Sequence, residues 1–157
     1  MITIGSIVDY PDMAPQIARW LYNEWNYLEP EASVEDWTKS IREQMYKDRI
    51  PVMFVALDKS NPIGCIALVK KDTATSMDFS PWLGAFYVTE DYRGRGVGLR
   101  LARRLIHCAK NFDIPALYAC VTDMRLRNIA HRRGWNTVGQ EFYKNRLVTV
   151  ISLELNA

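Results

Sequence analysis

The stretch of sequence that decides the fold is Val88-Thr89-Glu90-Asp91-Tyr92-Arg93-Gly94-Arg95-Gly96-Val97-Gly98-Leu99. Residues 82–88, which lead into this stretch and end at its first residue, are mostly apolar, aromatic or β-branched and predict a strand. After it, apolar residues recur at helical spacing and predict an amphipathic helix over residues 97–112. A strand that passes through a glycine-rich turn into a helix is typical of a phosphate-binding site.

The physical reason lies in the helix start. The first N–H groups of a helix have no internal acceptor, and glycines let a phosphate approach them without meeting a Cβ. Arg93 and Arg95 can add charge-assisted hydrogen bonds, and residues 92–112 contain no acidic side chain. A dinucleotide fingerprint fits poorly because the third glycine comes one position early. A Walker loop fits poorly too, because the Gly-Lys-Ser/Thr ending is absent.

The rest of the chain predicts further strands and helices on both sides of this turn. We expect strands at residues 1–8, 52–57, 63–70, 116–121, 135–141 and 146–155, and helices at 12–25, 33–47 and 123–133. Asp12, Ser33 with Asp36, and Asp123 are the expected helix caps, and Gly134 is the expected helix end. The fold class is therefore α/β (α+β), a mixed and mostly antiparallel sheet of about seven strands flanked by about four helices. No repeat or linker divides the chain, so we expect one domain over residues 1–157.

Composition excludes several classes of protein. Of the 157 residues, 48% are hydrophobic and 24% are charged, which argues against a disordered or fibrous chain. No apolar run approaches the ~18 residues of a membrane span, and Asp9 and Asp12 do not fit a signal peptide. Cys65, Cys108 and Cys120 have no C-x-x-C spacing. We therefore expect reduced thiols in a cytoplasmic protein, and no metal site.

Charge is distributed unevenly along the chain. Residues 1–90 carry 8 basic and 13 acidic side chains, whereas residues 91–157 carry 12 basic and 5 acidic ones. This asymmetry suggests one anionic and one cationic ligand, although a solvated surface would give the same counts. The arginines of the basic half lack a nucleic-acid reading motif, so neither a nucleic acid nor a membrane is the expected partner.

At Arg93, Gly96 and Gly98 the pattern Arg-x-x-Gly-x-Gly resembles the acetyl-CoA-binding signature of the GNAT N-acetyltransferase superfamily. The expected order of elements is similar to that fold over essentially the whole chain, and residues 81–88 and 143–155 resemble an uncharacterised bacterial subgroup. The resemblance implies an enzyme that transfers an acetyl group from acetyl-CoA to a primary amine within a ternary complex. The alternative is an acyl-CoA-binding module with weakened catalysis. A homodimer is left open.

The resemblance also implies where acetyl-CoA binds. Its pyrophosphate would lie on the N–H groups from Arg93 to Leu99, and its pantetheine arm would pair with the backbone around Phe86 and Val88. The Val88 N–H would then polarise the thioester carbonyl as a small oxyanion hole. The implied binding residues are Phe86, Val88, Arg93, Gly94, Arg95, Gly96, Val97, Gly98 and Leu99.

The residues that supply an acid and a base in the family are replaced here. The position of the family's tyrosine acid holds Ala130, and the strand position where some relatives carry glutamate holds Trp82. Tyr118, His131 and Asp78 are the candidate substitutes. Each also has a structural interpretation: a packing tyrosine, a surface histidine and a solvated loop carboxylate. Cys120 is interpreted as a small buried side chain rather than a nucleophile.

The acceptor is expected to bind near the connection between the first two helices. That connection reads Glu24-Trp25-Asn26-Tyr27-Leu28-Glu29-Pro30-Glu31. Its carboxylates and aromatic rings suit a cationic amine, a small molecule or a peptide. The candidate acceptor-binding residues are Glu24, Trp25, Tyr27 and Glu29. The alternative is that the tryptophans belong to the core and the acids are solvated. Charge does not distinguish a polyamine, an aminoglycoside, an amino acid or a peptide N-terminus.

Overall fold

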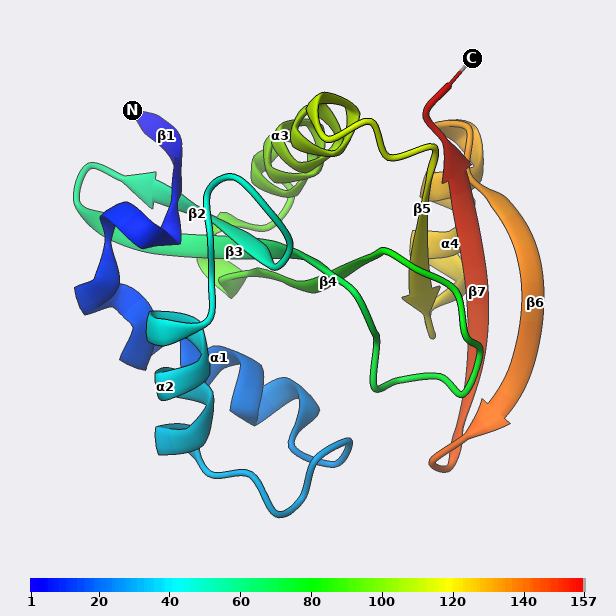
Figure 1. Cartoon of the computed structure of the whole chain (residues 1–157), viewed down its shortest axis with the longest axis horizontal. Coiled ribbons are helices and arrows are strands. Elements are labelled where there is room, and N and C mark those ends of the chain that lie inside the picture. The colour runs from blue at the N-terminus through cyan, green and yellow to red at the C-terminus, as the bar shows by residue number, and fades with distance from the viewer. Residues whose placement is uncertain (157) are drawn as a thin grey trace.

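The computed structural model describes residues 1–156, and its elements follow the predicted order (Figure 1). The strands are β1 (Ile2–Ser6), β2 (Val52–Asp58), β3 (Asn61–Val69), β4 (Trp82–Val88), β5 (Ala116–Val121), β6 (Asn136–Tyr143) and β7 (Arg146–Glu154). The helices are α1 (Ala14–Trp25), α2 (Val34–Glu43), α3 (Val97–Asn111) and α4 (Met124–Arg132). The expected fold class, a mixed sheet with flanking helices, is confirmed.

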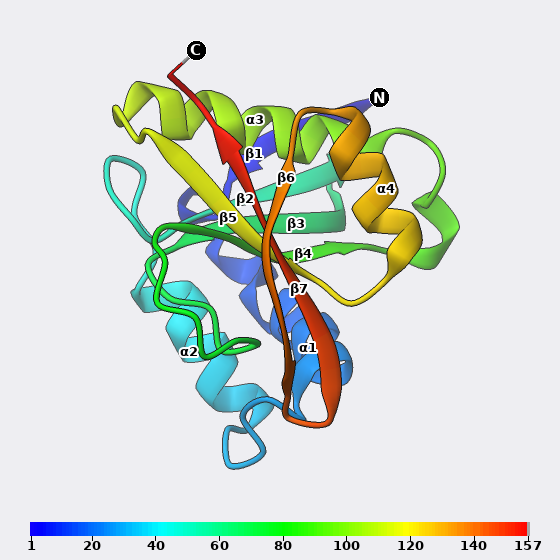
Figure 2. The same cartoon turned by 90° about the vertical axis from the view of Figure 1, so that its right-hand side faces the viewer.

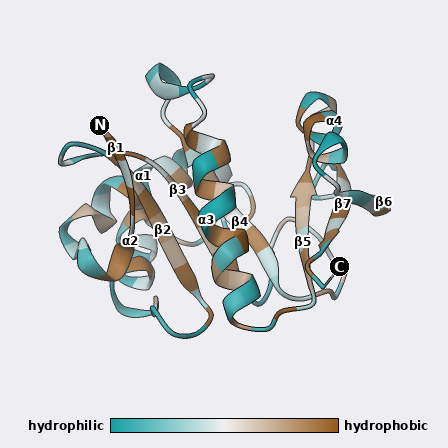
Figure 3. Cartoon of the chain, turned by 90° about the horizontal axis from the view of Figure 1, so that it is seen from above, coloured by the Kyte–Doolittle hydropathy of each residue, from teal (hydrophilic) through white to brown (hydrophobic). Residues whose placement is uncertain are grey.

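The sheet has seven strands in the order β1-β2-β3-β4-β5-β7-β6. All neighbours are antiparallel except β4 and β5, which are parallel and pair at one register position, Trp82 with Tyr118. The Tyr118 N–H donates to the Pro81 carbonyl at 3.1 Å. Beyond that pair the two strands diverge, as the view from above makes plain (Figure 3). Beyond Trp82, the backbone of β4 therefore has no strand partner on the side of β5.

Helices cover both faces of the N-terminal part of the sheet. α3 lies on one face, and α1 and α2 lie on the other (Figures 1 and 2). Along β2, Phe54 belongs to the core under α3, whereas Met53 and Val55 belong to the core under α1 and α2. Because both faces are covered, β2 and β3 are continuous apolar runs rather than alternating ones. A smaller cluster contains Trp82 and Val150, with the ring of Trp82 fully buried between β4 and β7.

The core under α3 continues across the divergence of β4 and β5. Leu101 and Leu105 of α3 lie in the same buried cluster as Leu68 of β3, Leu117 of β5 and Ile151 of β7. The apolar stripe of α3 is visible along the helix in Figure 3. Side chains thus join the two halves of the sheet where backbone pairing ends.

Two of the expected helix caps are present in the structure. Ser33 and Asp36 form a capping box, with the Asp36 N–H donating to Ser33 Oγ at 3.0 Å. Asp123 caps α4 through the Arg125 N–H at 2.8 Å.

Two expected helix boundaries are wrong. Asp12 does not cap α1, because it lies in the preceding 3-10 turn and the helix begins after Met13. α2 ends at Glu43 rather than near Lys47, because the chain turns there and the Tyr46 N–H pairs with the Pro51 carbonyl at 2.9 Å. None of the helices described in residues 1–156 combines the length and the apolar character needed to cross a membrane.

Candidate active site

The glycine turn has the geometry that an anion site needs. Gly94 and Gly96 have φ angles of +77° and +82°, which L side chains rarely adopt, and a Cβ at either position would meet no atom within 4 Å. Gly96 is the N-cap of α3, and the first helical hydrogen bond runs from the Arg100 N–H to the Gly96 carbonyl at 3.1 Å. The N–H groups of Gly96, Val97, Gly98 and Leu99 therefore have no helical acceptor. They lie at the positive end of the helix dipole, and the space beside Gly96 is open.

Arg93 has a different arrangement from the expected one. Its N–H donates to the Glu90 carbonyl at 3.2 Å, so the run of available amides begins after Arg93. Its side-chain Nε donates to the Val88 carbonyl at 2.9 Å, and its guanidinium lies 5.5 Å from the centre of the Tyr87 ring. Arg93 thus fastens the turn to β4, whereas Arg95 is exposed beside the glycines.

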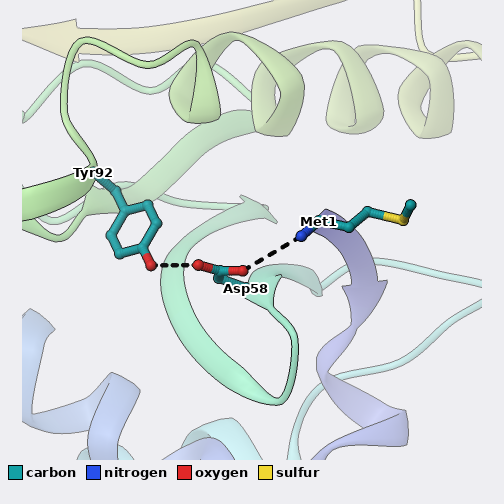
Figure 4. A network of polar contacts seen from close by, with 3 residues as sticks. All are labelled: Met1, Asp58 and Tyr92. Atoms are coloured by element: carbon teal, nitrogen blue, oxygen red, sulfur yellow. Dashed lines mark hydrogen bonds and ion pairs between the residues drawn. The ribbon is translucent and has the colours of Figure 1, made fainter.

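A polar network anchors the acidic turn that precedes the glycines (Figure 4). The Tyr92 hydroxyl donates to the Asp58 carboxylate at the end of β2, and the amino group of Met1 lies 3.6 Å from the same carboxylate. The hydrogen bond from Tyr92 lowers the pKa of Asp58. The network fixes the turn relative to the sheet.

The open edge of β4 contains an irregularity beside the divergence. Cys65 pairs with Tyr87 but Ala67 pairs with Gly84, so a β-bulge separates the two pairs and Ala85 takes a φ of +48°. The Thr89 N–H donates to the Ile63 carbonyl of β3 at 2.9 Å.

The register after the bulge sets the direction of the Val88 backbone. Because hydrogen-bonding direction alternates along an antiparallel strand, the N–H of Val88 points away from β3, toward the gap beside β5. This is the direction that the predicted role of Val88 requires.

Phe86 and Gly98 bring this edge next to the glycine turn. A Cβ on Gly98 would lie 3.3 Å from Cζ of Phe86 and 3.8 Å from Cγ2 of Val88. The absence of a side chain at Gly98 therefore lets β4 and the first turn of α3 approach closely. The ring of Phe86 is 39% exposed at this junction. The expected cofactor-binding residues are thus brought together on one surface.

The three acid or base candidates are not brought together. Tyr118 lies beside Trp82, and its ring stacks on Phe79 with centroids 4.5 Å apart. His131 is exposed on α4, with Nε2 3.0 Å from the Thr137 hydroxyl of β6, which directs the ring away from β4. Asp78 is exposed in the loop between β3 and β4. Of the three, Tyr118 is the one placed where β4 and β5 meet.

Two cysteine thiols lie near this region, a buried one at Cys65 and a half-buried one at Cys120, but neither is activated. Cys65 donates to the Ala85 carbonyl at 3.2 Å, and burial raises its pKa to about 12. Burial also raises the pKa of Cys120, and the nearby carboxylates of Asp72 and Glu141 add to that effect. Both groups are therefore protonated thiols at neutral pH, which supports the interpretation of Cys120 as a packing residue.

Sequence reasoning missed two carboxylates that shape the loop at residues 70–81. Glu141 of β6 accepts hydrogen bonds from the Ser76 N–H at 2.7 Å, from the Ser76 hydroxyl at 2.6 Å and from the Thr75 hydroxyl. The bonds from Ser76 and Thr75 lower the pKa of Glu141. Asp72, at the start of the loop, has its pKa raised by burial. No local pattern marks either residue, because their surroundings are built by strands that come much later in the chain.

The acceptor candidates lie on the opposite face of the sheet from α3. Glu24 and Glu29 are exposed, whereas Trp25 packs against the core under α1 and α2. The guanidinium of Arg146 lies 4.3 Å from the centre of the Tyr27 ring. Nearby, Lys144 Nζ donates to the Leu28 carbonyl at 2.6 Å. The charge of this surface is therefore mixed, because the turn between β6 and β7 brings two cations to the acidic connection.

Comparison with known families identifies the fold. The family model described as the acetyltransferase (GNAT) family matches residues 14–135. The chain belongs to the GNAT acetyltransferase family. A comparison with curated proteins returned no match.

Solved structures with the same GNAT fold have low sequence identity to this chain. An acetyltransferase of the GNAT family from Streptococcus pneumoniae is 15% identical with a TM-score of 0.73, covering 99% of this chain and 100% of the other. A putative acetyltransferase from Salmonella typhimurium with acetyl-CoA is 17% identical with a TM-score of 0.73, covering 100% and 95%. An aminoglycoside 6'-N-acetyltransferase complexed with coenzyme A is 13% identical with a TM-score of 0.75, covering 99% and 98%. At these identities the likeness supports the fold alone.

Proposed function

We propose that this GNAT protein is an acetyl-CoA-dependent N-acetyltransferase that transfers the acetyl group directly to a primary amine in a ternary complex. One observation carries the proposal: the unpartnered amides at the start of α3 adjoin the open edge of β4 at the point where β5 diverges. A phosphate site and an unpaired strand edge side by side match the two parts of coenzyme A, a pyrophosphate and an amide-bearing arm.

Binding of the donor follows from this arrangement. The pyrophosphate accepts hydrogen bonds from the N–H groups of residues 96–99, and the guanidinium of Arg95 adds positive charge. The pantetheine arm extends β4 as an added strand and pairs with the backbone of Phe86 and Val88. Open space at Gly94 and Gly96 leaves room for the phosphates.

The chemistry needs a donor for the negative charge that develops on the thioester oxygen. The N–H of Val88 is directed into the gap and supplies that hydrogen bond. The neutral amine attacks the carbonyl carbon, a C–N bond forms, and the C–S bond breaks with its electron pair on the sulfur of coenzyme A. The products are an acetamide and free coenzyme A.

The acceptor in this proposal is a small-molecule or peptide amine. It approaches from the face that carries α1 and α2, where Glu24, Trp25, Tyr27 and Glu29 supply carboxylates and aromatic rings. A cytoplasmic location is part of the proposal, supported by three free cysteines in the described chain, Cys65, Cys108 and Cys120.

Two measurements test the proposal. Calorimetry should detect acetyl-CoA binding, and a thiol-reactive dye should report coenzyme A release when a polyamine, an aminoglycoside, an amino acid or a peptide is added. Absence of binding by any acyl-CoA contradicts the proposal.

The second candidate function is a catalytically weakened acyl-CoA-binding module. Ala130, which stands at the position of the family's acid, packs against the core under α3 and offers no proton donor. This module would bind acetyl-CoA but transfer its acetyl group to none of the amines. Gain of activity in an Ala130→Tyr variant of an otherwise inactive protein would favour the module.

A further inference from the structure

A carboxylate lies where β4 and β5 begin to diverge. Asp72 follows β3 and is held in a turn by the Ala74 N–H, which donates to its Oδ1 at 2.8 Å. Its Oδ2 lies 4.0 Å from the place that a Cβ on Gly84 of β4 would occupy. The Cys120 thiol of β5 is close enough to the same carboxyl group to lower its pKa. The carboxyl group therefore lies beside both diverging strands.

The register shows which face of the sheet this carboxylate occupies. Gly84 pairs with Ala67, and Ala67 belongs to the core under α1 and α2. Residues directly opposite each other in a sheet project to the same face, so Asp72 lies on the face opposite α3. This is the face from which the acceptor approaches, and Gly84 directly precedes the bulge at Ala85 and Phe86. Asp72 is half-buried rather than sealed, so a ligand can reach it.

We propose that Asp72 is the general base of the acetyl transfer and that its carboxylate accepts, through water, the proton lost by the attacking amine. The inference rests on the proposed function. As the C–N bond forms and the C–S bond breaks, the electron pair of the C–S bond leaves on sulfur. The proton held by Asp72 then passes through water to the thiolate, which gives the acetamide and the thiol of coenzyme A.

The surroundings suit this role. Burial raises the pKa of Asp72, which makes its carboxylate a stronger base than an exposed one. Two titratable groups lie around Asp72. The Cys120 thiol on β5 is protonated because its own pKa is raised, and Glu141 on β6 contributes to that raised pKa. Trp82, which stands where some family members carry a glutamate, is fully buried and supplies no base. Asp72, in the loop between β3 and β4, supplies a carboxylate in place of that glutamate.

The test compares Asp72→Asn with Asp48→Asn, the same change at an exposed loop carboxylate that has no proposed role in the site. Asp72→Asn should lower kcat about 100-fold or more, the range of general-base catalysis, while calorimetry gives an unchanged Kd for acetyl-CoA. Asp48→Asn should retain wild-type activity. If Asp72→Asn keeps kcat within threefold of wild type, the inference is overturned. If the wild type binds no acetyl-CoA, the proposed function itself fails, which is a distinguishable result.

Stability separates a base from a structural residue. An Asp with a raised pKa binds more protons in the folded state than in the unfolded state, so its contribution to stability falls as pH rises through that window. Asn does not titrate and still accepts the Ala74 N–H. Asp72→Asn should therefore melt at or above the wild-type temperature at neutral pH. A large loss of both Tm and activity would assign Asp72 a structural role.

Two further readouts do not depend on that variant. Cys120→Ala removes the thiol that lowers the pKa of Asp72, so the acidic limb of the kcat profile should move to higher pH; an unmoved limb counts against the inference. If no amine in the panel is acetylated, NMR of ¹³C-labelled aspartate remains decisive. Adding acetyl-CoA should shift the Asp72 carboxyl resonance and leave that of the exposed Asp48 unchanged, and an unmoved Asp72 resonance overturns the inference.

Discussion

Replacing Gly96 with alanine tests the amide site on which the function depends. Gly96 has a φ of +82°, and an L residue in that conformation costs about 1–2 kcal/mol. For a chain of 157 residues, this corresponds to a decrease in Tm of roughly 2–8 °C. The methyl group would project into space with no protein atom within 4 Å, which is the space assigned to the phosphates.

The same substitution should weaken binding. If Gly96→Ala relaxes toward negative φ, the adjoining peptides rotate and at least one N–H no longer points at the pyrophosphate. A hydrogen bond to a charged group contributes about 1.5–3 kcal/mol, so Kd for acetyl-CoA should increase about 10-fold to 150-fold. Isothermal titration calorimetry measures this directly.

Gly134→Ala is the matched control. Gly134 has a φ of +97° at the end of α4, and a Cβ there would make an ordinary 3.6 Å contact with Leu153. It should lose a similar amount of stability through the same backbone strain, but its Kd for acetyl-CoA should not change. If Gly96→Ala binds acetyl-CoA within twofold of wild type while its Tm falls, the amides at the start of α3 do not hold the pyrophosphate.

Three further predictions concern the scaffold. Ser33→Ala removes the capping hydrogen bond to the Asp36 N–H and should lower the free energy of unfolding by about 1 kcal/mol in urea titrations, whereas an unchanged midpoint would contradict the capping role. Leu101→Ala empties a fully buried site under α3 and should cost about 2–5 kcal/mol in the same assay; a cost below this range would mean that the core closes around the cavity. Cys65, with a pKa of about 12, and Cys120, whose pKa is also raised, should resist a thiol-reactive dye in the folded protein at mildly alkaline pH, and guanidinium should make them reactive; rapid reaction without denaturant would contradict the raised pKa values.

Local patterns in the sequence were sufficient to predict most of the fold. The capping box at Ser33 and Asp36 involves residues three positions apart, and Gly134 marks a helix end by its own conformation. The expected cap at Asp12 was wrong because two 3-10 turns fill the connection from β1, which no nearby spacing reveals. The glycine turn was predictable because its chemistry lies within one short segment.

The acceptor side of the site was less predictable, because long-range contacts create it. Asp72 acquires its burial and its thiol neighbour from β5, and the loop that carries it is held by Glu141 of β6. Similarly, Lys144 reaches the Leu28 carbonyl, so the local charge near the first two helices differs from the charge of the N-terminal half. The net charge counted over a stretch of sequence does not include such contacts with residues from elsewhere in the chain.

The junction of β4 and β5 has a mechanical consequence. Backbone pairing there is limited to Trp82 and Tyr118, while side chains under α3 span both halves of the sheet. The spacing of β4 and β5 is thus set by the volume of residues such as Leu105 and Leu117 and not by a continuous ladder of backbone hydrogen bonds. A substitution in that buried layer can change this spacing, and so affect a ligand that pairs with β4, without contacting the ligand.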